Sequence, residues 1–271
     1  MNKTVFIDFD GTFADHGRIP AAHLEAVRLA RAAGHRVFLC TGRPKVMVPR
    51  RVRDGVFDGL VCAAGGYVEV DGQVLSDVRF PAELGARAAT VLVEARASFL
   101  LEAPEAVFSS AESAQQVRAI FASASWPGEP DDSDDLLVAL RPTDRLDECS
   151  FSKVSVFDSP IPVTTLAERI GPEVGALPNS VTGLSGHAGE LYQLGVDKSV
   201  GIAAVEARLG LRREDIVAIG DGHNDLEMLA YAGVGVAVEE APPEVRAVAQ
   251  VIIPGPGRGG LLPGFAELGL T

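Results

Sequence analysis

The chain contains few cysteines and no long apolar run, and both deficits narrow the class of protein. Its 271 residues include only three cysteines, Cys40, Cys62 and Cys149, and none belongs to a Cys-x-x-Cys pair. Their odd number and wide spacing predict buried thiols in a reducing compartment. No segment approaches the roughly 20 apolar residues of a membrane-spanning helix, and Asp8 comes too early for a secretory signal. We therefore expect a soluble, cytoplasmic protein.

The sequence also lacks a surplus of positive charge and two common nucleotide-binding motifs. Asp and Glu number 37 against 24 Lys and Arg, which gives a net charge of -13. Such a surface repels phosphate backbones and anionic lipids, so we expect neither nucleic acid nor a membrane as partner. There is no GxxxxGK[ST], and no GxGxxG follows the first expected strand. A small phosphate can still bind where local donors or a metal ion reverse the field.

Apolar segments alternate with segments of helical periodicity at both ends of the chain. A strand, a helix and a second strand come first, which is a βαβ pattern and predicts a parallel sheet. A third strand follows, and then a hairpin that turns at Asp71-Gly72. The pattern predicts an α/β fold with a Rossmann-like, doubly wound parallel sheet. Strands are expected at 4–9, 36–40, within 60–75, and at 215–221, 234–238 and 249–254, and helices at 20–34, 198–211, 224–233 and 242–249.

The middle of the chain has a different pattern, which predicts a second, α+β domain inserted into the first. We expect a core formed by residues 1–80 and 186–271 and an inserted domain at 81–185. The acidic stretch at 126–135 is typical of a solvated loop. The expected helices of the insertion lie at 81–98, 113–124 and 163–170, and its expected strands at 136–141, 152–158, 179–184 and 189–194.

Two carboxylates, Asp8 and Asp10, follow the first strand, where Gly11 begins a turn. Ligands of open α/β sheets bind at the carboxyl ends of the strands. Carboxylates this close repel each other, and that arrangement favours a bound cation. With a divalent ion present, one carboxylate can act as a nucleophile and the other as general acid and base. Taken alone, the pattern is also compatible with carboxylates that only cap a loop.

Two further stretches carry groups suited to binding an anion. Thr41 and Gly42 follow the second strand, where a hydroxyl and a backbone N–H could hold phosphate oxygens. Lys198 opens a helix, and a cation at that end does not suit the helix dipole. Helix stability therefore does not explain Lys198, whereas contact with an anion would.

A fourth stretch adds two carboxylates and an amide. Asp221 ends another apolar strand, and Asn224 and Asp225 open the next helix. Asp225 alone could be a helix cap or first-turn residue, but Asp221 is harder to explain in that way. Together the four stretches supply a nucleophile, an acid/base, an anion clamp and metal ligands along one edge of the expected sheet.

The four stretches read DFDGT, TGR, DKSVGI and GDGHNDLEML. In this order they resemble the four motifs of the haloacid dehalogenase (HAD) superfamily of phosphohydrolases. The pattern is most similar to the Cof-type branch, whose members carry a large α/β cap of the C2 type between the second and third motifs. The resemblance covers residues 1–80 and 186–271. It implies that residues 81–185 form a cap that sets substrate specificity.

The resemblance also implies a role for each matching residue. Asp8 would be the nucleophile that forms an aspartyl-phosphate, and Asp10 would be the general acid/base. Mg²⁺ would be bound by Asp8, Asp221 and the backbone carbonyl of Asp10, and Asp225 would support the metal directly or through water. The residues that would hold the phosphoryl group are Thr41, Gly42, Lys198 and Asn224.

Two positions stand apart from the family pattern. Cof-type members usually carry Asn-Gly after the third core strand, whereas this chain has Ala64-Gly65, so any contact from that Asn is lost. His223 occupies a variable position and either belongs to a surface loop or faces the substrate.

The cap residues considered for substrate contact are Arg141, Lys153, Glu190 and, as the preferred candidate, His187.

These implications favour a Mg²⁺-dependent phosphatase, a phosphoric monoester hydrolase acting on a small phosphorylated metabolite such as a sugar phosphate, as a monomer or homodimer. A phosphomutase of the same superfamily would share the nucleophile motif and a similar cap, and it stays an alternative. A non-catalytic regulator that binds a phosphorylated ligand is a third interpretation. Against it, the chain retains Asp8, Asp10, Lys198 and Asp221.

Overall fold

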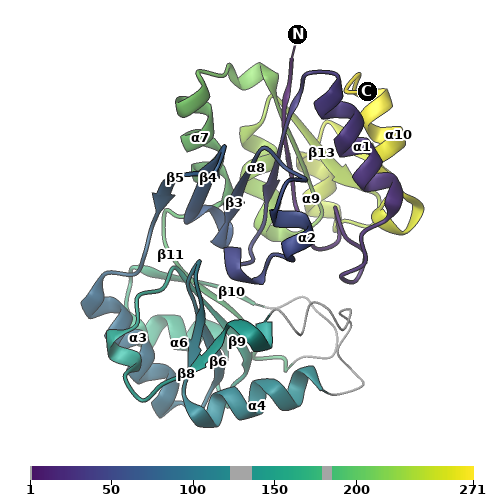
Figure 1. Ribbon diagram of the computed structural model, residues 1–271. Coiled ribbons are helices and arrows are strands. Elements are labelled where there is room, and N and C mark those ends of the chain that lie inside the picture. Colours follow the sequence, from purple (N-terminus) through teal and green to yellow (C-terminus); the bar gives the residue numbers. More distant parts are fainter. Residues whose placement is uncertain (1, 123–135, 179–184) are drawn as a thin grey trace. The chain divides into compact units, whose positions relative to one another are not determined.

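The computed structural model describes residues 2–122, 136–178 and 185–271, and the chain divides into two compact units (Figure 1). The first unit comprises Met1–Arg43, Val48–Asp77 and Asp197–Thr271, and the second comprises Pro44–Met47 and Val78–Val196. We expected the core to resume at residue 186, but the second unit extends to Val196. The reason is that strand β11 (Gly189–Gln193) pairs with strands of the sheet in the second unit.

The first unit is built on an eight-stranded sheet in the order β14-β13-β12-β1-β2-β3-β4-β5. The strands from β14 to β3 run parallel, and β4 and β5 form an antiparallel hairpin at one edge. Asp71 and Gly72 both have positive φ in the hairpin turn, as predicted for this pair. The strands are β1 (Thr4–Ile7), β2 (Arg36–Cys40), β3 (Gly59–Cys62), β4 (Tyr67–Val70), β5 (Gln73–Asp77), β12 (Ile216–Gly220), β13 (Val234–Val238) and β14 (Val251–Ile253).

Helices cover both faces of this sheet, which confirms the doubly wound α/β prediction. Helix α1 packs beside α10 on one face, and α7 and α8 lie together on the other (Figure 1). Right-handed crossovers explain this, because the chain moves from β1 to β2 in one direction and from β12 to β13 in the other. The helices are α1 (Ala21–Ala32), α2 (Arg50–Arg53), α7 (Lys198–Leu209), α8 (Leu226–Tyr231), α9 (Pro243–Val248) and α10 (Leu261–Glu267), with 3-10 turns η2 (Ala63–Gly65), η4 (Arg213–Asp215), η5 (His223–Asp225) and η6 (Pro256–Arg258). The 3-10 turn η1 (Lys45–Met47) belongs to the second unit.

The second unit is an α+β arrangement around a mostly antiparallel six-stranded sheet in the order β10-β11-β9-β6-β7-β8. Alternate residues of β6 enter different cores: Phe99 and Leu101 pack with α3 and α6, while Leu100 packs with α4 on the other face. The elements are β6 (Ser98–Glu102), β7 (Val107–Ser109), β8 (Leu140–Pro142), β9 (Lys153–Asp158), β10 (Val174–Pro178), β11 (Gly189–Gln193), α3 (Ala82–Glu94), α4 (Ala111–Phe121), α6 (Val163–Ile170) and η3 (Leu146–Glu148).

The sequence did not predict three strands of this unit, β6, β7 and β10. The helix expected over 81–98 ends at Glu94 in a Schellman turn, in which Arg96 has φ +53° and Ala97 N–H donates to the Leu92 carbonyl at 3.1 Å. No glycine marks this end, so the sequence carries no stop signal there. Residues 136–139 are helical, so the strand expected at 136–141 is wrong at its start. The stretches 126–135 and 179–184 lie outside the described residues.

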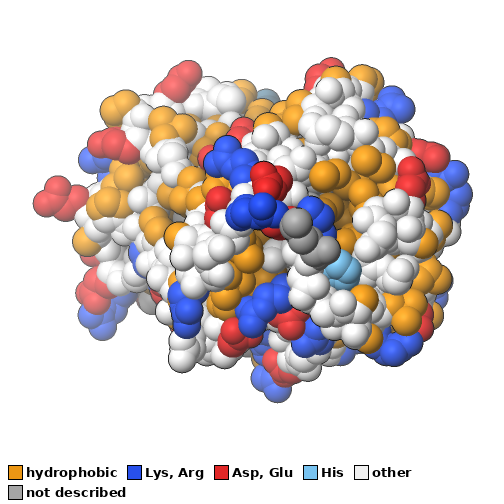
Figure 2. Space-filling view, turned by 90° about the horizontal axis from the view of Figure 1, so that it is seen from above, with side chains coloured by type: hydrophobic (Ala, Val, Ile, Leu, Met, Phe, Trp, Pro, Cys, Tyr) orange, Lys and Arg blue, Asp and Glu red, His pale blue; other side chains and the backbone are white. Residues whose placement is uncertain are grey.

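The surface carries both signs of charge despite the net charge of -13. On the face shown in Figure 2, basic and acidic side chains lie next to one another, with apolar side chains between them. None of the three cysteines forms a disulfide. Among the described residues, no helix combines the length and apolar character needed to span a membrane.

Candidate active site

Three neighbouring strands of the first unit end at the same edge of the sheet. Each is followed by a polar residue that the sequence predicted to belong to the active site. Strand β1 pairs in parallel with β2 on one side and with β12 on the other. Asp8 follows β1, Thr41 follows β2 and Asp221 follows β12. The Asp8 N–H continues the ladder by donating to the Ile219 carbonyl at 2.9 Å. The sheet topology therefore brings together residues that are far apart in the sequence.

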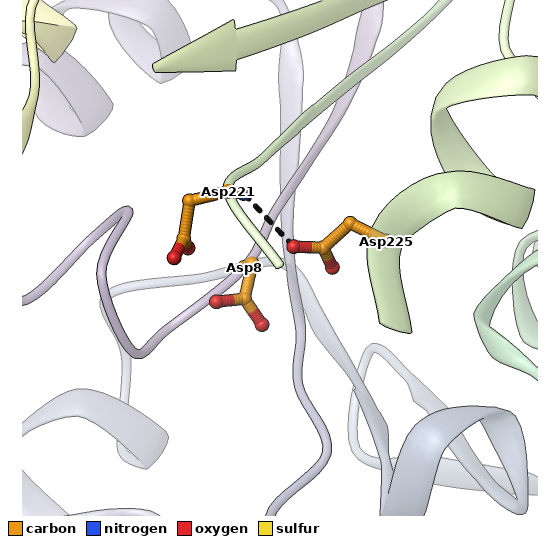
Figure 3. Close-up of side chains that lie close together, drawn as sticks. All are labelled: Asp8, Asp221 and Asp225. Atoms are coloured by element: carbon orange, nitrogen blue, oxygen red, sulfur yellow. Dashed lines mark hydrogen bonds between the residues drawn. The ribbon is translucent and has the colours of Figure 1, made fainter. Parts of the chain in front are cut away.

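Three carboxylates, those of Asp8, Asp221 and Asp225, converge at this edge (Figure 3). Each offers an oxygen, and these oxygens all lie within 4.8 Å of one another. Asp225 is fully buried and Asp8 is only 5% exposed. The predicted metal-ligating side chains thus lie close together in a largely buried position.

Asp225 is held in place by hydrogen bonds to both of its carboxylate oxygens. Its Oδ2 accepts the backbone N–H of Asp221 at 2.9 Å and that of Gly222 at 2.8 Å. Its Oδ1 forms an ion pair with Lys198. Both oxygens are therefore committed within the chain, which distinguishes Asp225 from the other two carboxylates.

Lys198 lies between two carboxylates and is completely buried. Its Nζ donates to Asp8 Oδ1 at 2.5 Å and also to Asp225. The N-terminus of helix α7 is capped by the residue before Lys198: Asp197 Oδ1 accepts the N–H of Ser199 at 2.8 Å. Asp197 therefore provides the acceptor for the helix N-terminus, and the Lys198 side chain points to the two carboxylates.

The turn after β1 brings the chain against Asp221. Gly11 has φ +84°, and a Cβ at this position would lie 2.3 Å from Asp221 Oδ2, so only glycine fits. Thr12 is buried, and its hydroxyl donates to Asp221 Oδ1 at 2.7 Å. The sequence analysis did not single out Thr12, although it belongs to the DFDGT stretch, and its hydroxyl fixes one oxygen of Asp221.

Burial and mutual repulsion dominate the electrostatics of the cluster. Burial raises the pKa of Asp8 well above its usual range, and the nearby Lys198 ammonium opposes this shift. Burial, together with the charge of Asp225, raises the pKa of Asp221 to about 7. Burial disfavours the charged form of Lys198, but Asp225 and Asp8 outweigh it and raise the Lys198 pKa. One lysine thus shares a site with more negative charge than it can balance.

Asp10 and Thr41 are both linked to Arg43, which the sequence analysis did not single out. The half-exposed Asp10 carboxylate accepts from Arg43 Nε at 2.8 Å and from its terminal nitrogen at 2.6 Å. The Arg43 backbone N–H donates to the hydroxyl oxygen of the buried Thr41 at 3.1 Å. The signal in the sequence was the TGR triplet, in which Gly42 separates the two residues.

The loop after β3 packs against both predicted phosphate-binding segments. All three residues of η2 have positive φ, including Ala64 at +51°. The Ala64 N–H donates to the Thr41 carbonyl at 3.1 Å. A Cβ on Gly65 would lie 1.9 Å from the Asp197 carbonyl oxygen, so glycine is required where the loop meets the start of α7.

The remaining predicted residues lie around the site or in the other unit. Asn224 and the exposed His223 belong to η5, next to Asp225. Arg141 and His187 belong to the second unit, and both make local contacts there. Arg141 donates to the Leu140 carbonyl at 3.1 Å, and His187 Nδ1 lies 2.9 Å from the Ser159 carbonyl oxygen.

The family of the chain is established by comparison with known protein families. Residues 5–262 match the family of haloacid dehalogenase-like hydrolases. The chain belongs to this family. It is a Cof-type member of the HAD superfamily and a phosphoric monoester hydrolase, as the sequence motifs predicted.

Individual relatives agree with this assignment. The chain is 25% identical to the candidate phosphatase YkrA of Bacillus subtilis over 277 residues, which cover 99% of this chain and 98% of YkrA. A solved structure of the HAD subclass IIB sugar phosphatase BT4131 superimposes with a TM-score of 0.80 at 21% identity, over 100% of both chains. TM0651 of Thermotoga maritima gives a TM-score of 0.77 at 18% identity, covering 98% of this chain and 97% of that one. Both solved structures share the fold of the whole chain.

Proposed function

We propose that this HAD enzyme is a Mg²⁺-dependent phosphatase that hydrolyses a small sugar phosphate through an aspartyl-phosphate on Asp8. The observation that carries the proposal is the largely buried cluster of Asp8, Asp221 and Asp225, in which Lys198 pairs with Asp8 and Asp225. Three carboxylates beside one ammonium group repel one another, and a divalent cation would stabilise their ionised forms. A nucleophilic carboxylate beside such a cation is suited to phosphoryl transfer.

The residues present fit a magnesium ion. Oxygen atoms are the ligands that Mg²⁺ prefers, and every side chain offered here is a carboxylate. Because both Asp225 oxygens are engaged, Asp8 and Asp221 are the side chains that can ligate directly. We assign the third protein ligand to the backbone carbonyl of Asp10, with Asp225 supporting the site. When bound, the ion would withdraw charge from the phosphoryl oxygens.

In the first half of the reaction, a carboxylate oxygen of Asp8 attacks the phosphorus atom. The bond between phosphorus and the leaving oxygen breaks, and Asp10 gives its proton to that oxygen, so the product leaves as an alcohol. Lys198 lies 2.5 Å from Asp8 and offsets charge on the attacking group.

In the second half, Asp10 takes a proton from a water molecule, whose oxygen attacks the phosphorus atom. The bond between phosphorus and the Asp8 oxygen breaks, which restores the carboxylate and releases inorganic phosphate. Asp10 regains its proton in this step, so the enzyme returns to its starting state.

The phosphoryl oxygens would be held by groups that converge from several strand ends. The Thr41 hydroxyl accepts from the Arg43 N–H, so its own hydrogen can be donated to a phosphoryl oxygen. Lys198 supplies charge, and the Gly42 N–H and the Asn224 amide supply further donors. Such positioning and electrostatic stabilisation account for most of the catalysis in phosphoryl transfer.

The second unit would act as a cap that sets specificity and excludes water during transfer. The sugar phosphate class is supported by the name of the structural neighbour BT4131, a sugar phosphatase. Arg141 and His187 are proposed as substrate contacts from this unit. We place the enzyme in the cytoplasm, because its three cysteines form no disulfide. A monomer or a homodimer would both be consistent with this function.

The Asp8→Asn variant tests the function most directly. Its release of p-nitrophenol from p-nitrophenyl phosphate should fall at least about a thousandfold, since an amide oxygen is a poor nucleophile. The control is Asp54→Asn, which changes an exposed carboxylate of the same unit and should retain full activity. Substantial turnover by a folded Asp8→Asn variant would rule out the assigned role. A screen of phosphorylated metabolites for released phosphate would then identify the substrate, and transfer from a sugar bisphosphate would reveal a mutase.

A further inference from the structure

The Arg43 guanidinium donates hydrogen bonds to both oxygens of the Asp10 carboxylate. Its Nε donates to Oδ2 at 2.8 Å and a terminal nitrogen donates to Oδ1 at 2.6 Å. The guanidinium and the carboxylate therefore form a bidentate ion pair, which fixes the orientation of both groups as well as their separation. The Arg43 side chain is 19% exposed and that of Asp10 is 53% exposed.

Arg43 is itself held from several directions. Its guanidinium carbon lies 4.6 Å from the ring centre of Phe9, which is fully buried. Its backbone N–H donates to the Thr41 hydroxyl oxygen at 3.1 Å, and its carbonyl accepts the Ala63 N–H at 2.8 Å. Arg43 is thus the anchored member of the pair, and Asp10 is the more exposed member.

An exposed aspartate without such a partner would populate several side-chain rotamers. A general acid must lie within hydrogen-bond reach of the leaving oxygen, and a misplacement of about 1 Å can cost roughly a hundredfold in rate. The Arg43 guanidinium occupies one acceptor position on each Asp10 oxygen. Since a carboxylate has about four such positions, each oxygen keeps one for the proton that Asp10 gives and takes back.

We propose that Arg43 is the positioning residue for Asp10. It holds the acid/base carboxylate in one orientation at the edge of the site and acts on the reaction through Asp10 rather than by binding the phosphoryl group. The proposal rests on the proposed function, because it assigns Arg43 a role in the two proton transfers of Asp10.

The test compares Arg43→Gln with the wild type on two aryl phosphates of nearly the same shape. Phenolate is a poorer leaving group than p-nitrophenolate and depends more on protonation. The value of kcat/KM for phenyl phosphate should therefore fall about 30-fold or more, and that for p-nitrophenyl phosphate should fall much less. KM should change little on either substrate. Arg43→Lys keeps the charge without the fork and should give an intermediate loss.

A double-mutant cycle separates this role from direct phosphate binding. In an Asp10→Asn background, Arg43→Gln should cause no further loss beyond about twofold. A raised KM with an equal loss on both substrates and in both backgrounds would instead mean that Arg43 binds the phosphoryl group, and it would overturn the proposal. So would full activity of Arg43→Gln.

A matched surface pair provides the control. Arg28 donates to both carboxylate oxygens of Glu25 in the same bidentate geometry, at 2.7 and 2.6 Å, on the exposed side of α1. Arg28→Gln should leave both substrates unaffected. The unfolding transitions of all variants show whether they fold, and Arg43→Lys carries the test if Arg43→Gln does not. An inactive wild type or an active Asp8→Asn variant would refute the proposed function as well, whereas an active wild type with an unaffected Arg43→Gln refutes this proposal alone.

Discussion

Ala64 is held in a backbone conformation that alanine rarely adopts. Its φ and ψ are 51° and 40°, and the preceding Ala63 also has positive φ. The left-handed region costs an L-residue with a Cβ roughly 1–2 kcal/mol. The Ala64 N–H donates to the carbonyl of Thr41, so the strained loop supports a residue proposed to bind phosphate.

Replacing Ala64 with glycine should relieve this strain. We expect Ala64→Gly to raise the free energy of unfolding by about 0.5–1 kcal/mol, because the relief exceeds the entropy that glycine adds to the unfolded chain. Chemical denaturation monitored by circular dichroism measures the change. The matched control is Ala204→Gly inside α7, which should instead lose about 1 kcal/mol. A loss of stability at both positions would contradict the strain argument.

Three charged side chains lie close together on the central strands of the second unit, and two of them, Glu102 and Lys153, are buried. Glu102 on β6 lies opposite Lys153 on β9, and Glu190 on β11 lies next to them. Lys153 Nζ lies 2.5 Å from Glu190 and 3.4 Å from Glu102, and Ser155 donates to Glu102 at 2.5 Å. From the sequence, Lys153 and Glu190 were either structural residues or substrate contacts, and the structure pairs them with each other within the sheet.

Glu102 should make the stability of this sheet depend on pH. Burial raises its pKa above the ordinary value of 4.5, although Lys153 opposes the shift. The folded chain therefore keeps this proton to a higher pH than the unfolded chain. The stability that this provides is complete below about pH 4.5 and is lost as the pH rises through the folded-state pKa.

The Glu102→Gln variant isolates this contribution, because glutamine has no proton to lose. Between pH 4.5 and pH 8, the wild type should lose stability relative to Glu102→Gln, by about 1.4 kcal/mol per unit of raised pKa. Urea unfolding of both proteins at each pH measures the difference. Glu112→Gln changes an exposed side chain of α4 and serves as the control. If the wild type instead became more stable relative to Glu102→Gln as the pH rises, the expected direction would be contradicted.

On the scale of the whole molecule, the chain contains two separately packed units. The first has one continuous apolar core around its eight-stranded sheet, and the second has a core on each face of its own sheet. The carboxylate cluster lies entirely in the first unit. A metal bound by that cluster should therefore stabilise the first unit selectively.

Hydrogen exchange should reveal this selectivity. Mg²⁺ at tenfold excess over its Kd should stabilise the first unit by about 1.4 kcal/mol, which increases protection in β1, β2 and β12 but not in β6 or β9. EDTA should remove both the added protection and the phosphatase activity, and fresh Mg²⁺ should restore them. Asp221→Asn should abolish the effect, whereas Asp54→Asn should preserve it. Equal protection of both units, or an EDTA-insensitive rate, would contradict a metal site in this cluster.

Much of the first unit could be predicted because its signals are local. The alternation of short apolar strands with helices predicted the parallel sheet, and Asp71-Gly72 predicted the hairpin turn. The second unit was harder, since its strands pair between distant segments and its turns carry weak markers. Arg96 ends α3 where glycine is usual, and β6 was therefore missed.

By itself, the sequence determined the family and the strand ends at which Asp8, Thr41 and Asp221 stand, because parallel strands align their carboxyl ends along one edge. Only the tertiary structure decided how the side chains at that edge pair. Lys198 bridges two carboxylates, and Arg43 grips Asp10. Such pairing depends on side-chain direction, burial and contacts between residues distant in sequence, and no spacing pattern contains that information.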